Sequence, residues 1–430
     1  MTVAFLFISL AVFLLLEVPV AASLGLSAGL TLAFFNRSAL LGIPSIIFAN
    51  LTTPALLAIP YFIAAGIVLG RSGISGHLIG FAQMLVGRMR GGLAVVTVIV
   101  SIFLAGISGS GPADVAALGL VLIPAMTAAG YSKDFSAALM AACGGIGIII
   151  PPSIALIIYA LVADASPEKL FLAGVLPGVI VGAGLMVYVI ISCRKTQQPS
   201  DAPRPSLREF ISALRKAVWG LAAPALILGG IYSGLCTATE AAVVALAYAV
   251  AVERLIYRAM TWRQLFGCFR DAATTTGQIL LIVAAAGVFS FVMGLLDAPQ
   301  SSTLWLVGIG GGRIIFLILV NVLLLLAGCF LDAISIFYVI VPLLLPAAGH
   351  YGVDPVHFGV IITVNMAIGQ VTPPVGVNLF TAAGISGVPV WDIAKRALPL
   401  VIVELAALGI VTFIPWLSLW LPSLLTGAAK

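Results

Sequence analysis

The sequence predicts an all-α polytopic membrane protein. Of its 430 residues, 62% are hydrophobic and only 8% are charged, whereas a soluble domain carries about 25% charged residues. Apolar runs recur along the whole chain, and a run of about 18 residues is long enough to cross a bilayer. These runs are rich in Leu, Ala and Gly and do not alternate as transmembrane β-strands do. Helices are therefore expected to cross the membrane.

The first apolar run, MTVAFLFISLAVFLLLEVPVAAS, has two interpretations. A secretory signal peptide normally carries Lys or Arg before its apolar core, and none precedes this run. We therefore expect a retained first helix. About ten spans of this kind are expected, at 2–17, 20–36, 52–70, 133–163, 169–192, 217–235, 238–253, 273–296, 355–387 and 399–421.

Two further apolar regions, about 91–126 and 313–349, are broken in the middle. Each is either a pair of short spans or a re-entrant hairpin, and both options leave the next loop on the same side. With the N-terminus outside, the predicted cytoplasmic loops hold 16 of the 20 Lys and Arg residues. Because positive residues accumulate on the cytoplasmic side, both termini are expected to be periplasmic. The net charge of +5 then reflects topology, and no nucleic-acid partner is expected.

A polar stretch, 194–216, is a predicted cytoplasmic linker between two halves, 1–193 and 217–430. The halves repeat at an offset of 222 residues, most clearly where Pro151-Pro152 matches Pro373-Pro374. An odd number of predicted crossings separates equivalent elements, so the repeats are expected to be inverted. Inverted repeats with interrupted helices are typical of secondary transporters.

Four interruptions pair up across this repeat. GISGSGPAD corresponds to GCFLDAIS, and CGGIGIIIPPS corresponds to NMAIGQVTPPVGVN. Tandem prolines remove backbone donors, so the helices at 133–163 and 355–387 are expected to unwind. Exposed carbonyls with Ser, Thr and Asn oxygens suit Na⁺, and half-helix N-termini suit a carboxylate. A lone Gly or Pro usually marks a kink or a packing contact, but four interruptions in register favour a functional site.

The acidic residues within apolar sequence have functional and structural interpretations. Acids in a membrane are costly and by default suggest function, which singles out Asp114 and Asp332 near the two hairpin tips. Asp114 is equally well placed to cap the helix that starts near it. Glu240 follows two threonines and is expected to be a capping residue. Glu404 lacks such a context, and it is expected to face either a partner protein or the lipid boundary.

Several kinds of chemistry have little support. The five cysteines are scattered without a CxxC spacing, and only three histidines are present, which leaves little material for a metal framework. GISGSG is not a GxSxG nucleophile elbow, and the chain has no GxxxxGK[ST] phosphate loop. An intramembrane hydrolase that uses Asp114 and Asp332 remains an alternative, and it needs the two acids on facing helices.

Longer stretches point to one family. They are PALLAIPYFIAAG, GRMRGGLAVV, GISGSGPADVAALG, LIPAM, IIIPPS, FLAGVLPG, TATEAA, GVDPVHFGVIITVN and IGQVTPPVGVNLF. On these motifs the chain resembles, over nearly its whole length, the large membrane subunit of the tripartite ATP-independent periplasmic (TRAP) transporters. The last two motifs are the most specific.

The resemblance implies a bacterial inner-membrane transporter that works as an elevator and is driven by a Na⁺ gradient. Its substrates would be organic acids such as C4-dicarboxylates or sialic acid, with Na⁺ as coupling ion and no other cofactor. Its partners would be a periplasmic solute-binding protein and a small four-helix membrane subunit, expected as a separate polypeptide. A stand-alone Na⁺/dicarboxylate symporter of the same superfamily is the alternative within this class.

The resemblance also implies site residues. The first hairpin tip would lie at Ser108–Gly111 and the second at Asp332 and Ser335, with unwound loops at Gly144–Gly147 and Gly369–Pro373. The candidate ion- and substrate-binding residues are Ser108, Gly109, Ser110, Gly111, Asp114, Gly144, Gly145, Gly147, Pro151, Asp332, Ser335, Asn365, Gly369, Thr372, Pro373 and Asn378. The Na⁺ candidates among them are Ser108, Ser110, Gly147, Asp332, Gly369 and Thr372.

Overall fold

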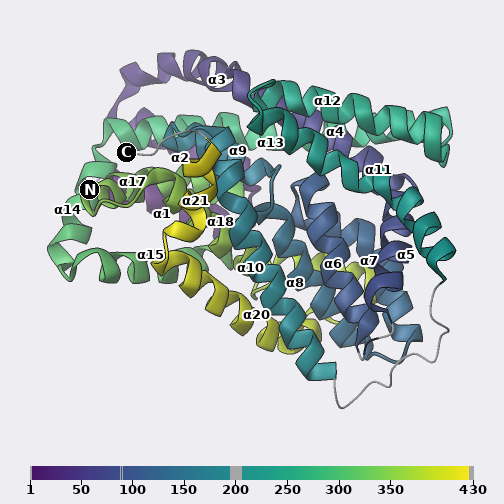
Figure 1. Ribbon diagram of the computed structural model, residues 1–430. Helices are drawn as coiled ribbons and strands as arrows, with labels where there is room; N and C mark the ends of the chain where they lie inside the picture. The colour runs from purple at the N-terminus through teal and green to yellow at the C-terminus, as the bar shows by residue number, and fades with distance from the viewer. Residues whose placement is uncertain (1, 88, 90, 194–205, 426–430) are drawn as a thin grey trace.

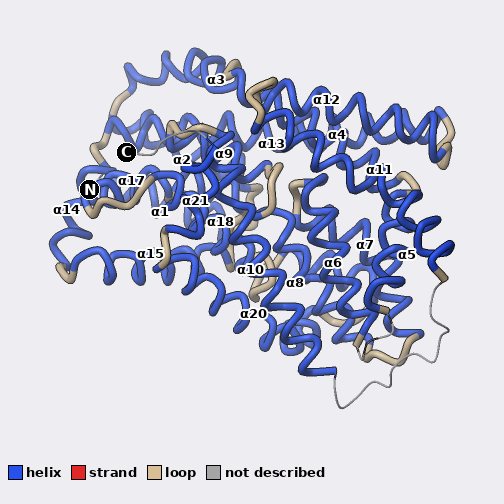
Figure 2. Tube along the Cα trace, viewed as in Figure 1, coloured by secondary structure: helices blue, strands red, loops and turns tan. Residues whose placement is uncertain are grey.

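The computed structural model describes residues 2–87, 89, 91–193 and 206–425. Within these residues the regular structure is helical and contains no strand (Figure 2), which confirms the predicted all-α class. Most of the predicted linker, residues 194–205, lies outside the described residues. A helix satisfies its own backbone hydrogen bonds, which is what an apolar chain needs inside a bilayer.

The chain begins with short apolar helices. In order these are α1 (Thr2–Leu15), α2 (Val20–Phe35), α3 (Ile43–Leu51), α4 (Ala58–Arg71) and α5 (Ile74–Val86). Short 3₁₀ segments precede α3 and α4. Helices α3 and α5 were not expected from the sequence, because runs of nine and 13 residues fall below the length of about 20 residues that marks a span.

The next group contains the first predicted interruptions. Its helices are α6 (Gly92–Ser108), α7 (Gly111–Ala128), α8 (Lys133–Ile149), α9 (Ile154–Ala163) and α10 (Pro167–Cys193). Only Gly109 and Ser110 separate α6 from α7, so the two helices form a hairpin. The second break, between α8 and α9, contains a cis peptide bond between Pro151 and Pro152.

The second half opens with four helices, three of which have capped N-termini. They are α11 (Leu207–Tyr232), α12 (Ala238–Ala251), α13 (Trp262–Leu295) and α14 (Ala298–Ile309). Capping boxes start the first three, and in α12 the Thr237 hydroxyl accepts from the backbone of Glu240 while Glu240 accepts from the backbone of Thr237. The predicted capping role of Glu240 is confirmed.

The remaining helices mirror the broken pattern of the first half. They are α15 (Gly312–Gly328), α16 (Ala333–Val339), α17 (Val341–His350), α18 (Pro355–Gly369), α19 (Val377–Ser386), α20 (Val390–Phe413) and α21 (Trp416–Leu425). The loop between α18 and α19 also holds a cis bond, between Pro373 and Pro374. The breaks between α15 and α16 and between α18 and α19 lie in the regions predicted from the sequence.

Six described helical segments are each long and apolar enough to cross a bilayer. The bent pairs α8–α9 (43°) and α16–α17 (58°) raise this number to eight. Four of the ten expected spans are not among these eight: 238–253, 355–387, and the spans of α1 and α2, which have 14 and 16 residues. At about 1.5 Å per residue these helices reach roughly 21–24 Å, less than the hydrocarbon core of about 30 Å.

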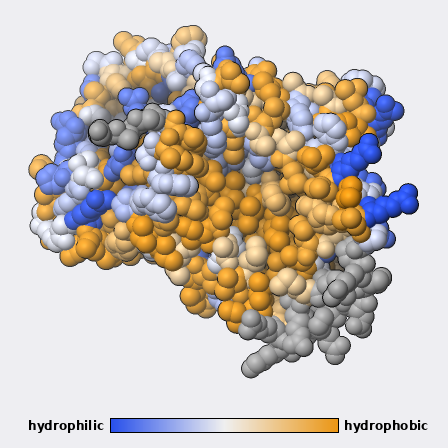
Figure 3. Space-filling view, in the orientation of Figure 1, coloured by the Kyte–Doolittle hydropathy of each residue, from blue (hydrophilic) through white to orange (hydrophobic). Residues whose placement is uncertain are grey.

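The helices pack in two groups (Figure 1). In one group α4 packs against α12 and α13, α2 against α1 and α13, and α11 against α12. In the other, α8 lies at the centre and contacts α6, α7, α18, α19 and α20. The outer surface in Figure 3 is largely apolar, and Leu15 and Leu41 are more than 80% exposed. Such a surface suits contact with lipid.

Candidate functional site

The first hairpin tip is a tight turn of two residues. Gly109 ends α6 with φ of +63°, a left-handed conformation that glycine adopts at little cost. Its backbone also runs so close to the α8–α9 break that an added Cβ would lie 2.6 Å from the Pro152 carbonyl oxygen. Ser110 then starts α7, and its N–H donates to the Ser108 hydroxyl at 3.3 Å. The sequence-predicted interruption at Ser108–Gly111 is confirmed.

Asp114 lies one turn into α7 and is 1% exposed. The Ser108 side chain lies close to the Asp114 carboxyl group. However, neither carboxyl oxygen has a hydrogen-bond partner of ordinary geometry among the described residues. The N-terminus of α7 has no side-chain cap, so the capping interpretation of Asp114 is wrong. A Cβ added at Gly147 would collide with Asp114 Oδ2, which places the carboxyl group directly against α8.

Gly144, Gly145 and Gly147 lie inside α8, so the predicted unwinding of Gly144–Gly147 is wrong. The helix ends only at Ile149. Glycine costs a helix about 1 kcal/mol per residue, but here the missing side chains allow close packing on two sides. An added Cβ at Gly144 would lie 3.0 Å from the Gly111 carbonyl oxygen, and one at Gly145 would lie 3.2 Å from the carbonyl oxygen of Ala367 in α18.

The break between α18 and α19 brings residues from the second half of the chain to the first hairpin. Helix α18 ends at Gly369, and residues 370–376 are non-helical before α19, so the loop predicted at Gly369–Pro373 is displaced toward the C-terminus. Asn378 Nδ2 donates to the Ala141 carbonyl at 3.1 Å, and a Cβ added at Gly111 would collide with Gln370 Oε1. The oxygens Asn378 Oδ1 and Gln370 Oε1 are buried without a partner among the described residues.

A group of residues from both halves of the chain therefore meets where α7 contacts α8. Asp114 lies against Gly147, Gln370 Oε1 lies against Gly111, and Asn378 Nδ2 lies against Gly111 and Gly144. We call this group the hairpin-1 cluster; it consists of Gly111, Asp114, Gly144, Gly147, Gln370 and Asn378. Gln370 was missed from the sequence, because no local pattern shows that a side chain from the second half reaches the first hairpin. The only signal was its position inside the predicted loop Gly369–Pro373.

The second hairpin tip is organised differently. Asp332 caps α16, accepting from the backbone N–H of Ile334 at 3.0 Å and of Ser335 at 3.4 Å. The Ser335 hydroxyl donates a further short hydrogen bond to the same carboxylate. Asp332 is therefore satisfied by its own helix, unlike Asp114. Ser110, which lies 222 residues before Asp332, is the N-cap residue of α7.

The tip of the second hairpin contacts the end of α18. The Val375 N–H donates to the Cys329 carbonyl at 3.1 Å, and a Cβ added at Gly369 would lie 2.9 Å from Gly328 Cα. Nearby, Thr372 Oγ1 donates to the Ile368 carbonyl at 2.7 Å. We call Gly328, Asp332, Asn365, Gly369 and Thr372 the hairpin-2 cluster. Asn365 Oδ1 is its buried oxygen without a partner among the described residues.

A cavity of about 550 Å³ lies beside the first hairpin tip. Gly66 and Gly70 of α4 line it together with Ser108, Ser110 and Asp114 of the first hairpin. Thr275 and Ile279 of α13 also line it. The lining also includes Arg71, whose guanidinium pairs with Asp271 at 2.7 Å. The cavity thus joins apolar walls to polar groups from the tip and to an ion pair.

Glu404 is a buried acid whose position the sequence did not predict. It lies in α20 with 1% exposure, and neither of its carboxyl oxygens has a hydrogen-bond partner among the described residues. It therefore lies neither at the lipid boundary nor on a partner surface. The cost of an acid within an apolar span was the signal available, and the packing of α20 against α8 could not be deduced locally.

The side chains of the two clusters carry carboxylate, amide and hydroxyl oxygens. No group of three or more His, Cys, Asp or Glu side chains within the described part of the chain could hold a metal. The hydrolase alternative fares poorly as well. Asp332 serves as a helix cap and Asp114 contacts Gly147, so the two acids belong to separate clusters.

Comparison with known proteins identifies the family. The model of the tripartite ATP-independent periplasmic transporter, DctM component, matches residues 7–417. The chain belongs to this family. It is thus a multi-pass inner-membrane permease subunit of a TRAP transporter, and not an enzyme. The resemblance inferred from the motifs is confirmed.

Individual relatives belong to the same family of TRAP transporter permeases. The chain is 40% identical over 401 residues to the C4-dicarboxylate TRAP transporter large permease protein DctM of Pseudomonas aeruginosa, covering 93% of this chain and 94% of that protein. It is 39% identical over 405 residues to the isethionate TRAP transporter permease protein DctMQ of Oleidesulfovibrio alaskensis, which covers 94% of this chain. The chain spans only 64% of the length of that second relative.

A solved structure supports the architecture of this TRAP permease subunit. The Alcanivorax borkumensis YdaH transporter, whose structure is described as having an unusual topology, superposes with a TM-score of 0.66. The match covers 96% of this chain and 98% of that chain at 14% sequence identity. At this identity the comparison supports the fold alone.

Proposed function

We propose that this TRAP permease subunit couples the inward movement of Na⁺ to the uptake of an organic acid. It would act with a small membrane subunit and a periplasmic solute-binding protein, and the chain's termini would both be periplasmic. The hairpin-1 cluster carries the proposal, because its buried oxygens lack partners within the protein. Leaving a polar group buried and unpaired costs about 1–3 kcal/mol, and a cation bound among these oxygens would offset that cost.

The first Na⁺ would be held by oxygens from both halves of the chain. Asp114 supplies a carboxylate, and Gln370 Oε1 and Asn378 Oδ1 supply amide oxygens. The Gly144 backbone carbonyl, which lies beside Gly111, is a further candidate ligand. Hard cations prefer such ligands. Because the set combines α7, α8, the α18–α19 loop and the start of α19, an ion there would fix the first hairpin against both broken helices.

A second Na⁺ would use the hairpin-2 cluster. Asn365 Oδ1 is unpartnered there, and Asn365 Nδ2 donates to Asn321 Oδ1 at 2.7 Å, which orients the free oxygen. The Thr372 hydroxyl and the carbonyls of the neighbouring break would complete the ligand set. Asp332 would contribute less than expected from the sequence, because its carboxylate is already engaged in capping α16.

The substrate would occupy the cavity between the first hairpin and α4. Ser108 and Ser110 offer hydroxyls to a carboxylate, and Arg71 offers a cation. The named relatives transport C4-dicarboxylates and isethionate, which are small organic anions and fit a cavity of this size and composition. In an elevator mechanism the first hairpin would carry this face past α4 and α13.

The test is uptake by the reconstituted large and small subunits, with the binding protein outside and a panel of labelled organic acids. Uptake of at least one acid should require an inward Na⁺ gradient and the binding protein. Gradient-independent uptake of every transported acid would overturn the coupling. Full uptake without the binding protein would instead favour a stand-alone symporter.

A further inference from the structure

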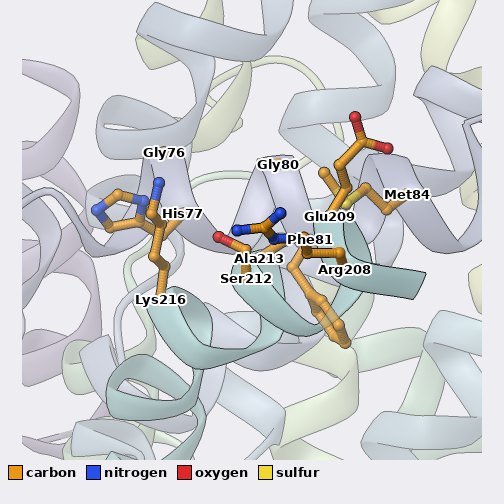
Figure 4. Close-up of a pocket in the computed structure, with 10 residues that line it drawn as sticks. All are labelled: Gly76, His77, Gly80, Phe81, Met84, Arg208, Glu209, Ser212, Ala213 and Lys216. Carbon is orange, nitrogen blue, oxygen red and sulfur yellow. The ribbon is translucent and has the colours of Figure 1, made fainter. Parts of the chain in front are cut away.

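A second cavity, of about 450 Å³, lies apart from both clusters, between α5 and the first turns of α11 (Figure 4). Gly76, His77 and Gly80 line it from α5, and Arg208, Ser212 and Lys216 line it from α11. Only 13 residues form α5, about 20 Å at 1.5 Å per residue, so α5 is too short to span the bilayer. The cavity belongs to no transport step described above.

Basic groups converge on this groove without an acidic partner. Burial and the nearby Lys216 both lower the pKa of His77, and Figure 4 shows the end of the Lys216 side chain beside the His77 ring. The His77 ring is held by stacking on Tyr257, 5.0 Å between centroids. Among the described residues neither Arg208 nor Lys216 forms an ion pair.

Glu209 is the one acidic residue among those that line the groove, and its carboxylate takes part in a helix cap. Glu209 Oε2 accepts from the Ser206 backbone N–H at 2.7 Å, as part of the capping box that starts α11. Arg208 and Lys216 are therefore solvent-exposed cations that form no ion pair among the described residues. An anion bound between them would be attracted by both cations.

Two glycines leave the floor of the groove open. Gly76 and Gly80 are one helical turn apart on α5, and a Cβ added at either would meet no atom within 4 Å. Glycine lowers the stability of a helix compared with alanine. A larger residue at either position would therefore stabilise α5, and the space beside the helix could accommodate its side chain. The absence of side chains preserves an open space bordered by basic groups.

The neighbouring face of α11 is apolar and exposed. Leu207, Ile211 and Leu214 are 76%, 54% and 37% exposed, and their spacing places them along one face of the helix. Arg208, Ser212 and Lys216 follow a parallel row that faces the groove. A basic row beside an apolar row is typical of a helix at the membrane–water interface.

We propose that this groove binds the headgroup of an anionic phospholipid. Arg208 and Lys216 hold the phosphate group, and the acyl chains lie along Leu207, Ile211 and Leu214. Basic pockets between membrane helices recognise such headgroups. A soluble phosphate would use the same cations but would leave the apolar row uncovered, which is why the lipid is the favoured source of the anion.

The test is native mass spectrometry of the purified large and small subunits, titrated with phosphatidylglycerol, phosphatidylcholine or inorganic phosphate. Phosphatidylglycerol should bind more tightly than the zwitterionic lipid. The R208Q/K216Q variant should lose about tenfold or more in affinity for phosphatidylglycerol, since each basic residue near a membrane surface contributes roughly fivefold. The control R215Q/R263Q removes the same charge from exposed positions outside the groove and should bind as wild type.

A second variant separates a filled groove from a lost charge. Gly80→Leu keeps every cation and improves the helix propensity of α5, yet it fills the groove and should also weaken phosphatidylglycerol binding. Wild-type affinity in both R208Q/K216Q and Gly80→Leu would overturn the site. Equal affinity for inorganic phosphate and phosphatidylglycerol would overturn the assignment of the lipid.

Discussion

Two aspartates that the sequence treats alike have different environments. Asp114 is fully buried without a hydrogen-bond partner of ordinary geometry, whereas Asp332 accepts three hydrogen bonds from the start of α16. Sequence position predicted that both acids lie near hairpin tips, but only tertiary packing decides whether a carboxylate is satisfied. The residue with the free carboxylate is the stronger candidate for an ion ligand.

Asp114→Asn should therefore lower Na⁺ affinity without unfolding the protein. The amide keeps the shape and removes the charge, and the loss of one charge-assisted contact of about 1.5–3 kcal/mol raises the half-maximal Na⁺ concentration about tenfold to a hundredfold. The measurement is the shift of the thermal unfolding midpoint as Na⁺ is added. Asp332→Asn is the control, because asparagine is also a good N-cap. An unchanged Na⁺ response in Asp114→Asn would remove Asp114 from the site.

Gly147→Ala should also disturb the site, by a steric route. An added methyl group would meet the Asp114 carboxylate, and overpacking of a close contact typically costs about 1–3 kcal/mol. Both the unfolding midpoint and the Na⁺ response should fall. Gly277→Ala, where a Cβ meets nothing within 4 Å, should leave both unchanged; equal behaviour of the two variants would contradict the tight α7–α8 contact.

At the scale of helices, the broken elements were largely predictable. Tandem prolines act locally through lost donors and restricted dihedrals, so Pro151-Pro152 and Pro373-Pro374 both mark real breaks. Glycines act differently, because their effect depends on what packs against them. Gly144–Gly147 stays helical since α7 and α18 approach α8 there, and no single-sequence pattern contains that information.

The contact between α4 and α7 gives a test of relative movement. An ideal Cβ at Gly70 lies 3.7 Å from the Ala117 Cβ, within the range of about 3.5–4.5 Å for a disulfide. The Gly70→Cys/Ala117→Cys pair should cross-link under oxidation and stop transport, because it ties the first hairpin to α4. Initial uptake before and after oxidation, and again after a reductant, is the measurement.

The cross-link requires matched controls. Either single cysteine variant should keep its uptake under oxidation, and so should the wild type, whose five native cysteines are free. Full transport by the cross-linked pair would contradict an elevator movement of the first hairpin past α4.

At the scale of the whole molecule, composition and motifs predicted the membrane class, the helical fold and the family. The short helices α3, α5 and α14 were missed, because 9, 13 and 12 residues are too few for a membrane span. The roles of Gln370 and Glu404 were missed for a different reason. Each depends on helices that meet only after the chain has folded, Gln370 at the first hairpin and Glu404 where α20 packs against α8.

The proposed inverted repeat relates the helix breaks of the two halves. If the two halves are related by this repeat, their breaks are expected to lie next to each other. The contact of Gln370, from the break after α18, with the first hairpin agrees with this. Ions placed there would tie the two halves together before the substrate moves. Na⁺ binding should therefore protect the backbone amides of Gly109–Asp114 from hydrogen exchange, and unchanged exchange at saturating Na⁺ would speak against this ordering.

The most direct test of the proposed Na⁺ site is Na⁺-gradient-driven uptake by the complete reconstituted transporter, with wild type, Asp114→Asn and Asp332→Asn compared at equal protein in the membrane. We expect rapid uptake by wild type, near-complete loss in Asp114→Asn at ordinary Na⁺ concentrations, and substantial uptake in Asp332→Asn. Wild-type uptake with the same Na⁺ dependence in Asp114→Asn would contradict the hairpin-1 cluster as the coupling site.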